Sequence, residues 1–271
     1  MTQQNKAKQP NLLIKTFQSL RKRGLLRTIL RIVKYPFDPF MARQKEKRVF
    51  GHTNIEDRFT EIYKRNYWDH EESISGSAST LFYTENLRKN LPELFAKFSI
   101  KSVFDAPCGD FNWMRYVIKD YPIDYIGGDI VLPLIKSNYE MHKTSNIQFV
   151  HIDLTKDQFP SANLMICRDC LFHLSYEDTK AVLKKFVESN IYYLLTSTHI
   201  NSKNFANKDI KTGSFRHIDL FSAPFNFPQN VLYRILDWRE PEPEDWREPE
   251  PEREMCLWSR EQIISALNTF N

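Results

Sequence analysis

The 271-residue sequence contains no long apolar run, only 7 glycines and only 4 cysteines. A helix that crosses a bilayer needs about 20 consecutive apolar residues, and no segment approaches this length. Residues 1–10 are polar and have no apolar signal core, so we do not expect secretion. The G-x-G-x-x-G turn typical of nicotinamide-dependent oxidoreductases is absent, which argues against that class. These absences predict a cytoplasmic protein without a transmembrane segment.

The cysteines are far apart in the sequence except for one C-x-x-C pair. Cys167 and Cys170 form this pair at the end of an apolar run, and no second pair of ligands accompanies them. A single pair in this position is weak support for zinc binding or redox chemistry. We therefore expect buried thiols in a reducing compartment and no bound metal.

Charge is unevenly distributed along the chain. Residues 1–50 carry 13 of the 38 basic residues but only 2 of the 34 acidic ones, a net charge of +11. The other 221 residues therefore hold 25 basic and 32 acidic side chains, a net charge of −7. An acidic body is unlike a nucleic-acid-binding face, so we expect no nucleic-acid partner.

Within the basic arm, apolar residues recur at helical spacing over residues 11–34. We consider two positions for this amphipathic helix: on the anionic inner face of a membrane, or docked on the main domain with a solvated basic face. The sequence leaves both open and does not indicate an oligomeric state. We divide the chain into a helical extension, residues 1–55, and a main domain, residues 56–271.

Residues 102–113, Ser-Val-Phe-Asp-Ala-Pro-Cys-Gly-Asp-Phe-Asn-Trp, are the segment around which the main domain is organised. A short apolar strand ends at Asp105, a tight turn with Pro107 and Gly109 follows, and a helix begins near Asn112. This order places backbone N–H groups at the carboxyl edge of a sheet, where nucleotide-like cofactors bind. A carboxylate beside the turn would repel a phosphate, so the pattern favours a cationic or hydroxyl-rich ligand.

Two later predicted strands also end in an acid, Asp129 and Asp153, each 24 residues beyond the previous one. The predicted strands after residue 113 span 123–129, 146–153, 162–168 and 191–197. Alternating strands and helices predict an α/β fold, with a Rossmann-like doubly wound sheet of about seven strands, mostly parallel. The three acids are therefore expected along one edge of the sheet, with Asp129 placed to accept hydrogen bonds from ribose hydroxyls.

The C-terminal third contains a long irregular segment, residues 199–228, and two β-like runs predicted to pair as an antiparallel hairpin. Between the runs, the octapeptide Asp-Trp-Arg-Glu-Pro-Glu-Pro-Glu occurs twice, at 237–244 and 245–252. Its prolines exclude a central strand, so we expect a solvated acidic loop. Ser259 and Gln262 fit a capping box at the start of a final helix.

Four segments of the main domain carry a resemblance to a known family. They are Phe-Thr-Glu-Ile-Tyr at 59–63, the Ser-rich loop from Glu72 to Ser77, Asp-Ala-Pro-Cys-Gly-Asp-Phe-Asn-Trp-Met at 105–114, and Cys-Arg-Asp-Cys-Leu-Phe-His-Leu at 167–174. Together they resemble the class I S-adenosylmethionine (SAM)-dependent methyltransferases, and specifically a bacterial group associated with surface-glycan biosynthesis. The turn departs from the superfamily pattern of an acid followed by three alternating glycines, because only Gly109 remains.

The resemblance implies SAM as cofactor and a set of residues that contact it. Asp105, Ala106, Pro107 and Gly109 would face the methionine and sulfonium end, where negative potential suits a cation. The other implied contacts are Asp129 and Ile130 at the ribose, Asp153 and Leu154 at the adenine, and Arg168 beside the transferred methyl group. The Ser-rich loop, taken over its full length at residues 71–80, can cap the helix predicted at 81–91 and is either a flexible connector or a lid over the cofactor.

The acceptor implied by the resemblance is a sugar or glycan hydroxyl, possibly lipid-linked if the basic arm binds a membrane. Three residues are candidates for the base that removes its proton: Asp169, His173 and His199, with His217 as a weaker one. Alternative hypotheses are methyl transfer to another small molecule and a scaffold that binds SAM without catalysis.

Overall fold

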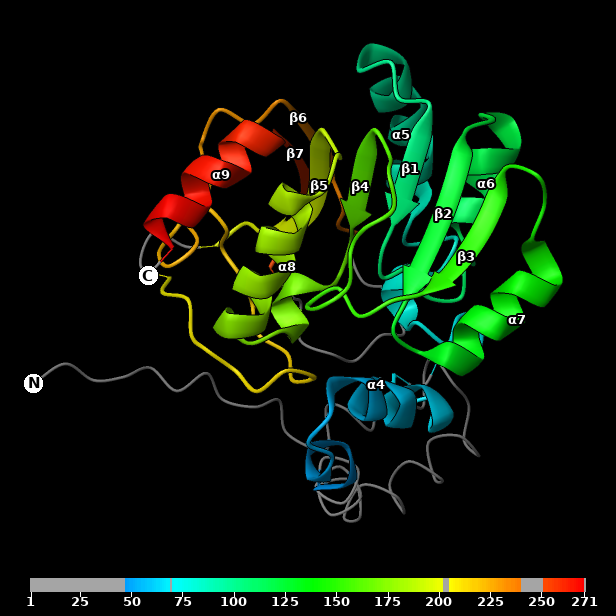
Figure 1. Ribbon diagram of the computed structural model, residues 1–271, viewed down its shortest axis with the longest axis horizontal. Coiled ribbons are helices and arrows are strands. Elements are labelled where there is room, and N and C mark those ends of the chain that lie inside the picture. The colour runs from blue at the N-terminus through cyan, green and yellow to red at the C-terminus, as the bar shows by residue number, and fades with distance from the viewer. Residues whose placement is uncertain (1–46, 69, 202–204, 240–250, 271) are drawn as a thin grey trace, which may run out of the picture. The chain divides into compact units, whose positions relative to one another are not determined.

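The computed structural model describes residues 47–68, 70–201, 205–239 and 251–270. Its centre is one seven-stranded sheet with the strand order β3-β2-β1-β4-β5-β7-β6 (Figure 1). The strands are β1 (Ser102–Asp105), β2 (Asp124–Asp129), β3 (Ile147–His151), β4 (Leu164–Cys167), β5 (Tyr193–His199), β6 (Tyr233–Leu236) and β7 (Arg253–Ser259). The predicted doubly wound, mostly parallel sheet with a terminal hairpin is confirmed.

The sheet contains both parallel and antiparallel strand pairs. β1 to β5 pair in parallel, and the segment between consecutive strands crosses one face of the sheet, mostly as a helix. β7 is antiparallel to both β5 and β6, so it lies between them. β6 therefore runs in the same direction as β5 and ends at the same sheet edge.

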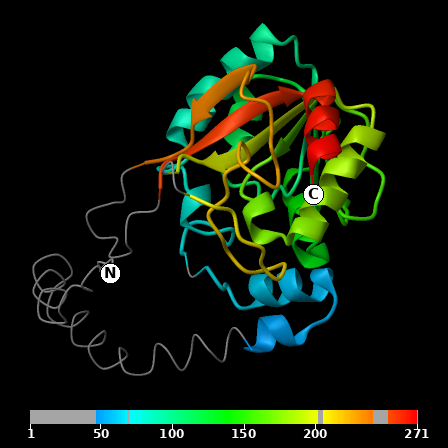
Figure 2. The same cartoon turned by 90° about the vertical axis from the view of Figure 1, so that its left-hand side faces the viewer.

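Helices cover both faces of the sheet (Figures 1 and 2). One face packs against α5, α6 and α7, and the other against α8 and α9. The helices are α4 (Ile55–Lys64), α5 (Glu85–Lys97), α6 (Met114–Asp120), α7 (Leu132–His142), α8 (Tyr176–Glu188) and α9 (Arg260–Thr269).

Two local predictions have opposite outcomes. The capping box at α9 is confirmed, because Ser259 and Gln262 each accept the other's backbone N–H. The Ser-rich loop, by contrast, does not cap the helix that follows it. α5 begins only at Glu85, and its N-cap residue Thr84 makes no side-chain capping bond.

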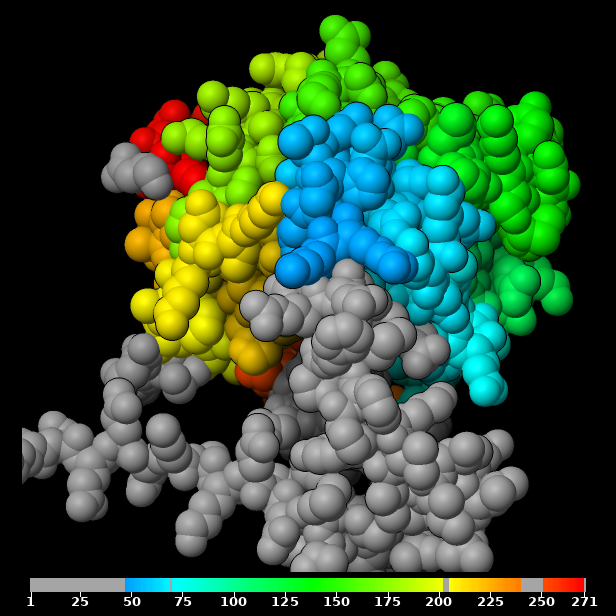
Figure 3. Space-filling view, turned by 90° about the horizontal axis from the view of Figure 1, so that it is seen from below, coloured from blue at the N-terminus to red at the C-terminus, as the bar shows by residue number. Residues whose placement is uncertain are grey.

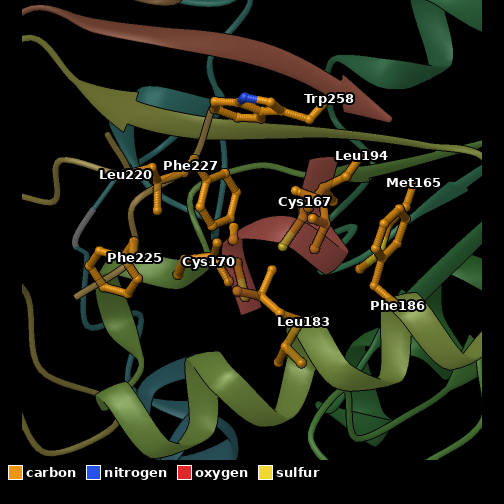
Figure 4. Close-up of a cluster of buried hydrophobic side chains, with 14 of the residues drawn as sticks. Met165, Cys167, Cys170, Leu183, Phe186, Leu194, Leu220, Phe225, Phe227 and Trp258 are labelled. Carbon is orange, nitrogen blue, oxygen red and sulfur yellow. The ribbon is translucent and has the colours of Figure 1, made fainter. Parts of the chain in front are cut away.

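The larger core cluster lies between the sheet and α8 (Figure 4). Trp258 of β7 is fully buried, donates its indole N–H to the Pro228 carbonyl at 2.9 Å and meets Phe227 edge-on at 4.9 Å. Aromatic packing thus holds Phe227 and Pro228 of the irregular segment against the sheet. All four cysteines are buried and unpaired with one another, as expected, and no group of metal-ligating side chains occurs within the described ranges.

α4 contacts both the irregular segment and the end of β3. Arg58 donates to the Thr212 carbonyl at 3.0 Å, and Glu56 pairs with His151 at the end of β3 at 3.2 Å. Figure 3 shows α4 beside the irregular segment on the same face. Within the described ranges, no helix is long and apolar enough to cross a membrane. The predicted helix at 11–34 and most of the acidic repeat lie outside those ranges.

Two adjacent residues of α9 test the core. Ile263 is fully buried, whereas Ile264 is 40% exposed. We expect Ile263→Ala to lower the free energy of unfolding by about 2–5 kcal/mol, because it removes buried methyl groups and leaves a cavity. Ile264→Ala makes the same chemical change on the solvent side and should cost under about 1 kcal/mol. Urea denaturation followed by circular dichroism measures both, and equal losses would contradict this placement of α9.

Candidate functional site

The turn after β1 is held to β2 and α7 by hydrogen bonds. The Cys108 N–H donates to the Gly128 carbonyl at 2.8 Å, and the Gly109 N–H donates to the Asp129 carboxylate at 3.2 Å. Asn138 of α7, fully buried, donates to the Gly109 carbonyl at 2.8 Å. Gly109 has a φ of +55°, which suits glycine, and an added Cβ would overlap the Ser75 hydroxyl. Only glycine therefore fits this point of the turn.

Two of the predicted acids meet at this turn. Asp105 is 3% exposed and accepts the Tyr125 hydroxyl at 2.8 Å, while Asp129 is 7% exposed and accepts the backbone N–H groups of Gly109 and Val131. Burial raises the pKa of Asp105 to about 7 and that of Asp129 to about 6. Among the described residues, neither carboxylate has an ion-pair partner within 4.0 Å, so this part of the edge can accept a cation.

The third acid, Asp153, is differently engaged. Its carboxylate accepts the backbone N–H and the hydroxyl of Thr155, and it pairs with Lys156 at 2.8 Å. Although burial alone would raise the pKa of Asp153, the hydrogen bonds from Lys156 and Thr155 hold it below its usual range. Asp153 thus bonds within its own turn, while the half-buried Leu154 follows it. The adenine role of this pair stays a prediction.

The Ser-rich loop packs directly on the turn. The Asp110 N–H donates to the Ser75 hydroxyl at 3.1 Å, and the Ile74 N–H donates to the Asp110 carboxylate at 3.0 Å. Asn112 donates to Glu72 at 2.8 Å and to the Ser79 carbonyl at 3.0 Å. These contacts give the loop a fixed position beside the turn, which argues against a free connector; its role as a lid stays a prediction.

Arg168 belongs to a buried network of two arginines and two aspartates. Its guanidinium forms two hydrogen bonds with Asp237, at 2.9 and 3.0 Å, and pairs with Asp169 at 3.1 Å. Arg253 of β7 pairs with the same acids, at 3.2 Å to Asp169 and 3.3 Å to Asp237. Arg168 also donates to the Ala78 carbonyl at 2.9 Å, which ties the Ser-rich loop to the end of β4.

Asp169, one of the predicted bases, therefore lies between two cations. Burial opposes ionisation, but Arg168 and Arg253 hold the pKa of Asp169 below its usual range. Its φ of +52° is uncommon for a residue other than glycine, and its N–H donates to the Ser197 hydroxyl at 3.0 Å. This carboxylate is suited to orient a hydroxyl group and is a weak proton acceptor.

The predicted histidines lie beyond this network, among aromatic rings. His173 is half-buried, and its Nδ1 lies 2.8 Å from the Ser214 carbonyl. His199 is 3% exposed, accepts the Ile218 N–H on Nδ1 at 3.2 Å, and has no partner for Nε2 among the described residues. Burial lowers the pKa of both rings, that of His199 to about 3. A buried donor without a partner costs about 1–3 kcal/mol, so the His199 Nε2–H is notable.

The structure adds residues that the sequence analysis missed. Tyr125 lies inside an apolar strand pattern, where nothing in the sequence distinguishes it from a core residue. Arg253 stands between two glutamates, where the sequence suggests a surface residue of a hairpin. Asp237 was assigned to a solvated loop, yet it is 1% exposed and closes the β6–β7 hairpin through its N–H to the Arg253 carbonyl at 2.8 Å. That assignment was wrong because the two arginines neutralise this aspartate in the interior. Its position directly after the apolar β6 was the available signal.

Comparisons with known proteins identify the fold. No protein-family model matches the sequence, and no curated protein matches it significantly. Among solved structures, human N-acetylserotonin methyltransferase has a TM-score of 0.53 at 11% identity, over 90% of this chain and 69% of that one. A SAM-dependent methyltransferase from Leishmania major has a TM-score of 0.52 at 12% identity, over 76% of this chain and 87% of that one. The chain described here has the Rossmann-like fold that these two methyltransferases share.

Proposed function

We propose that this protein is a SAM-dependent methyltransferase. The observation that carries the proposal is the pair Asp105 and Asp129 at the carboxyl edge of this sheet, both buried and, in the part of the chain that the structure describes, without an ion-pair partner. The human enzyme with a similar fold was crystallised with SAM, and the Leishmania protein is described as SAM-dependent. A cofactor with a sulfonium, an ammonium and two ribose hydroxyls matches carboxylates at this edge.

The residues present fit this cofactor. Asp129 accepts the Gly109 N–H on one carboxylate oxygen and the Val131 N–H on the other, and a carboxylate has about four acceptor positions, so room remains for a ribose hydroxyl. Asp105 bonds Tyr125 through Oδ2 and offers Oδ1 to a cation. Half-buried Pro107, Gly109 and Ile130 line the edge beside them. When bound, SAM supplies a methyl group already activated for displacement.

We further propose that the acceptor is a hydroxyl group of a sugar or glycan. The protein must align this oxygen with the methyl group and remove its proton as the new bond forms. Asp169 and His173 follow β4, and His199 ends β5, so the three lie at the sheet edge where such an acceptor would be held. Half-exposed aromatic rings, Trp68 and Phe215, lie 6.2 and 5.8 Å from His173 and offer apolar faces to a sugar ring.

A lipid-linked glycan is the finer form of this proposal, and it depends on the basic arm at residues 11–34. Deleting residues 1–46 from the full chain should abolish binding to vesicles that contain anionic lipid, because the net charge of the remaining residues is negative.

The alternative, a scaffold that binds SAM without catalysis, predicts cofactor binding without methyl transfer to any acceptor.

Replacement of Asp129 tests the ribose contact. Asp129→Ala removes the carboxylate between the turn and β2, and we expect SAM affinity to fall at least 100-fold while circular dichroism stays that of a folded protein. Asp124→Ala, at the exposed opposite end of β2, is the matched control and should leave affinity unchanged. Titration calorimetry measures both variants; unchanged affinity in Asp129→Ala would rule out the ribose assignment.

The raised pKa of Asp105 predicts a pH-dependent affinity. A cation binds the ionised carboxylate, so SAM affinity should rise between pH 5 and the Asp105 pKa of about 7 and then level off. Asp105→Asn should remove the part of this slope between about pH 6 and 7, because Asp129 titrates lower. Calorimetry in buffers of different ionisation enthalpy should detect proton release on binding to the wild type and less release in the variant.

The raised pKa of Asp105 has the opposite effect on the stability of the ligand-free protein. Between about pH 4 and 7 the folded state still holds the Asp105 proton that the unfolded state has lost, so the free energy of unfolding decreases as pH rises. Asp105→Asn should flatten this decrease in urea titrations. A wild-type stability that rises with pH across this window, but no longer rises in Asp105→Asn, would contradict the assignment.

The acceptor class is tested with labelled SAM and a panel of methyl glycosides of glucose, galactose, mannose and rhamnose. Label should move to a sugar hydroxyl, identified by mass spectrometry of the product. Small phenols and carboxylic acids are the comparison set. Transfer only to members of that set would overturn the sugar proposal, and SAM binding without any transfer would favour the scaffold.

A further inference from the structure

Three histidines surround one exposed phenylalanine near the ends of β4 and β5. The ring of Phe215 lies 5.8 Å from His173, 6.2 Å from His199 and 5.4 Å from His217. Phe172 lies beneath, 4.7 Å from His173 and 5.3 Å from His199. His173 and His199 therefore flank the same pair of aromatic rings, but their hydrogen bonds differ.

The bond of His173 fixes its proton on Nδ1. The partner at 2.8 Å is the Ser214 carbonyl, which can only accept, so Nδ1 must donate. In the neutral ring the lone pair is then on Nε2, which makes no hydrogen bond among the described residues. Because His173 is half-buried, this lone pair belongs to a side chain that a ligand can approach.

The bond of His199 fixes the opposite tautomer. Its Nδ1 lies 3.2 Å from the backbone N–H of Ile218, which can only donate, so Nδ1 accepts. The neutral ring therefore carries its proton on Nε2, and that N–H has no partner among the described residues. A ring in this state can donate a hydrogen bond but cannot accept a proton without breaking the bond to Ile218.

We propose that His173 is the general base of the methyl transfer and that His199 is a hydrogen-bond donor to a second oxygen of the acceptor. This assignment rests on the proposed function. The acceptor hydroxyl gives its proton to His173 Nε2 while its oxygen bonds the methyl carbon. The carbon–sulfur bond breaks, its electron pair returns to sulfur, and His173 later releases the proton to water. The acceptor class is thus a hydroxyl compound that carries a second oxygen, as in a sugar diol.

The surrounding charges are consistent with both roles. Asp169, after β4, favours the protonated form of His173 during the transfer, whereas Arg253 of β7 and Arg216 of the irregular segment oppose it. Burial is the larger effect and lowers the pKa of His173, so the ring is neutral and ready to accept a proton at neutral pH. Burial, Arg253 and His217 all lower the pKa of His199. Among the charged groups, Asp169 alone raises it.

Nitrogen NMR of the full chain, labelled with ¹⁵N in its 7 histidines, tests the tautomers without any substrate. His173 should show the Nδ1–H tautomer and His199 the Nε2–H tautomer, with His199 remaining neutral to below pH 5. Single His→Gln variants assign the signals. The opposite tautomers, or an Nδ1–H form at His199, would overturn the assignment whatever the protein methylates.

Two asparagine variants separate the roles in the reaction. In His173→Asn the amide nitrogen can still donate to Ser214, but the lone pair of Nε2 is lost, so kcat should fall about 100-fold or more. The acidic limb of the pH–kcat profile should disappear, and added imidazole should restore part of the rate. In His199→Asn the amide oxygen can still accept from Ile218, so kcat/KM should fall about tenfold with the acidic limb retained.

His52→Gln, remote in sequence from both rings, is the control and should leave the rates unchanged. Methyl glycosides with a free vicinal diol should react faster than those in which the neighbouring oxygen is replaced by hydrogen, and His199→Asn should remove this preference. Loss of the acidic limb in His199→Asn, or its retention in His173→Asn, would overturn the proposal. If SAM binds and no glycoside reacts, the proposed function fails, while the NMR result decides the tautomers separately.

Discussion

The paired salt bridges of Arg168 and Arg253 with Asp169 and Asp237 are the constraint on which the site depends. The four charges sum to zero, and each side chain comes from, or directly follows, a strand near the middle of the sheet or its antiparallel end. Isolated charges cannot be buried at this depth, but a neutral set with good geometry can. Removing one member would leave an uncompensated charge, so all four positions are fixed together.

This network connects the two halves of the site. Arg168 holds the Ser-rich loop through the Ala78 carbonyl. The loop packs on the turn that follows Asp105, and the turn itself contacts Asp129. Through Asp169, the same arginine sets the orientation of the carboxylate nearest the histidines. The part of the sheet edge that carries Asp105 and Asp129 and the part that carries the histidines are therefore built against a common electrostatic centre.

The sequence predicted the parts of this protein that depend on local patterns. Apolar runs closed by acids located β1 and β2, and Ser259 with Gln262 located the start of α9. It could not predict long-range pairing. Nothing local distinguishes Arg253 from a surface residue of a hairpin, and the choice between the histidines depends on a carbonyl 41 residues from His173 and an N–H group 19 residues from His199.

The hairpin formed by β6 and β7 has a consequence for how the protein tolerates change in length. Asp237 and Arg253 close the hairpin by a backbone hydrogen bond and by an ion pair, so the two strands keep their register whatever the number of residues between them. The octapeptide duplication falls between these two anchors, and either copy would supply the aspartate. Loss or gain of one copy would thus change only the number of residues between β6 and β7. The length of this connection can therefore change in steps of eight residues without loss of the ion pair that Arg253 makes with Asp169.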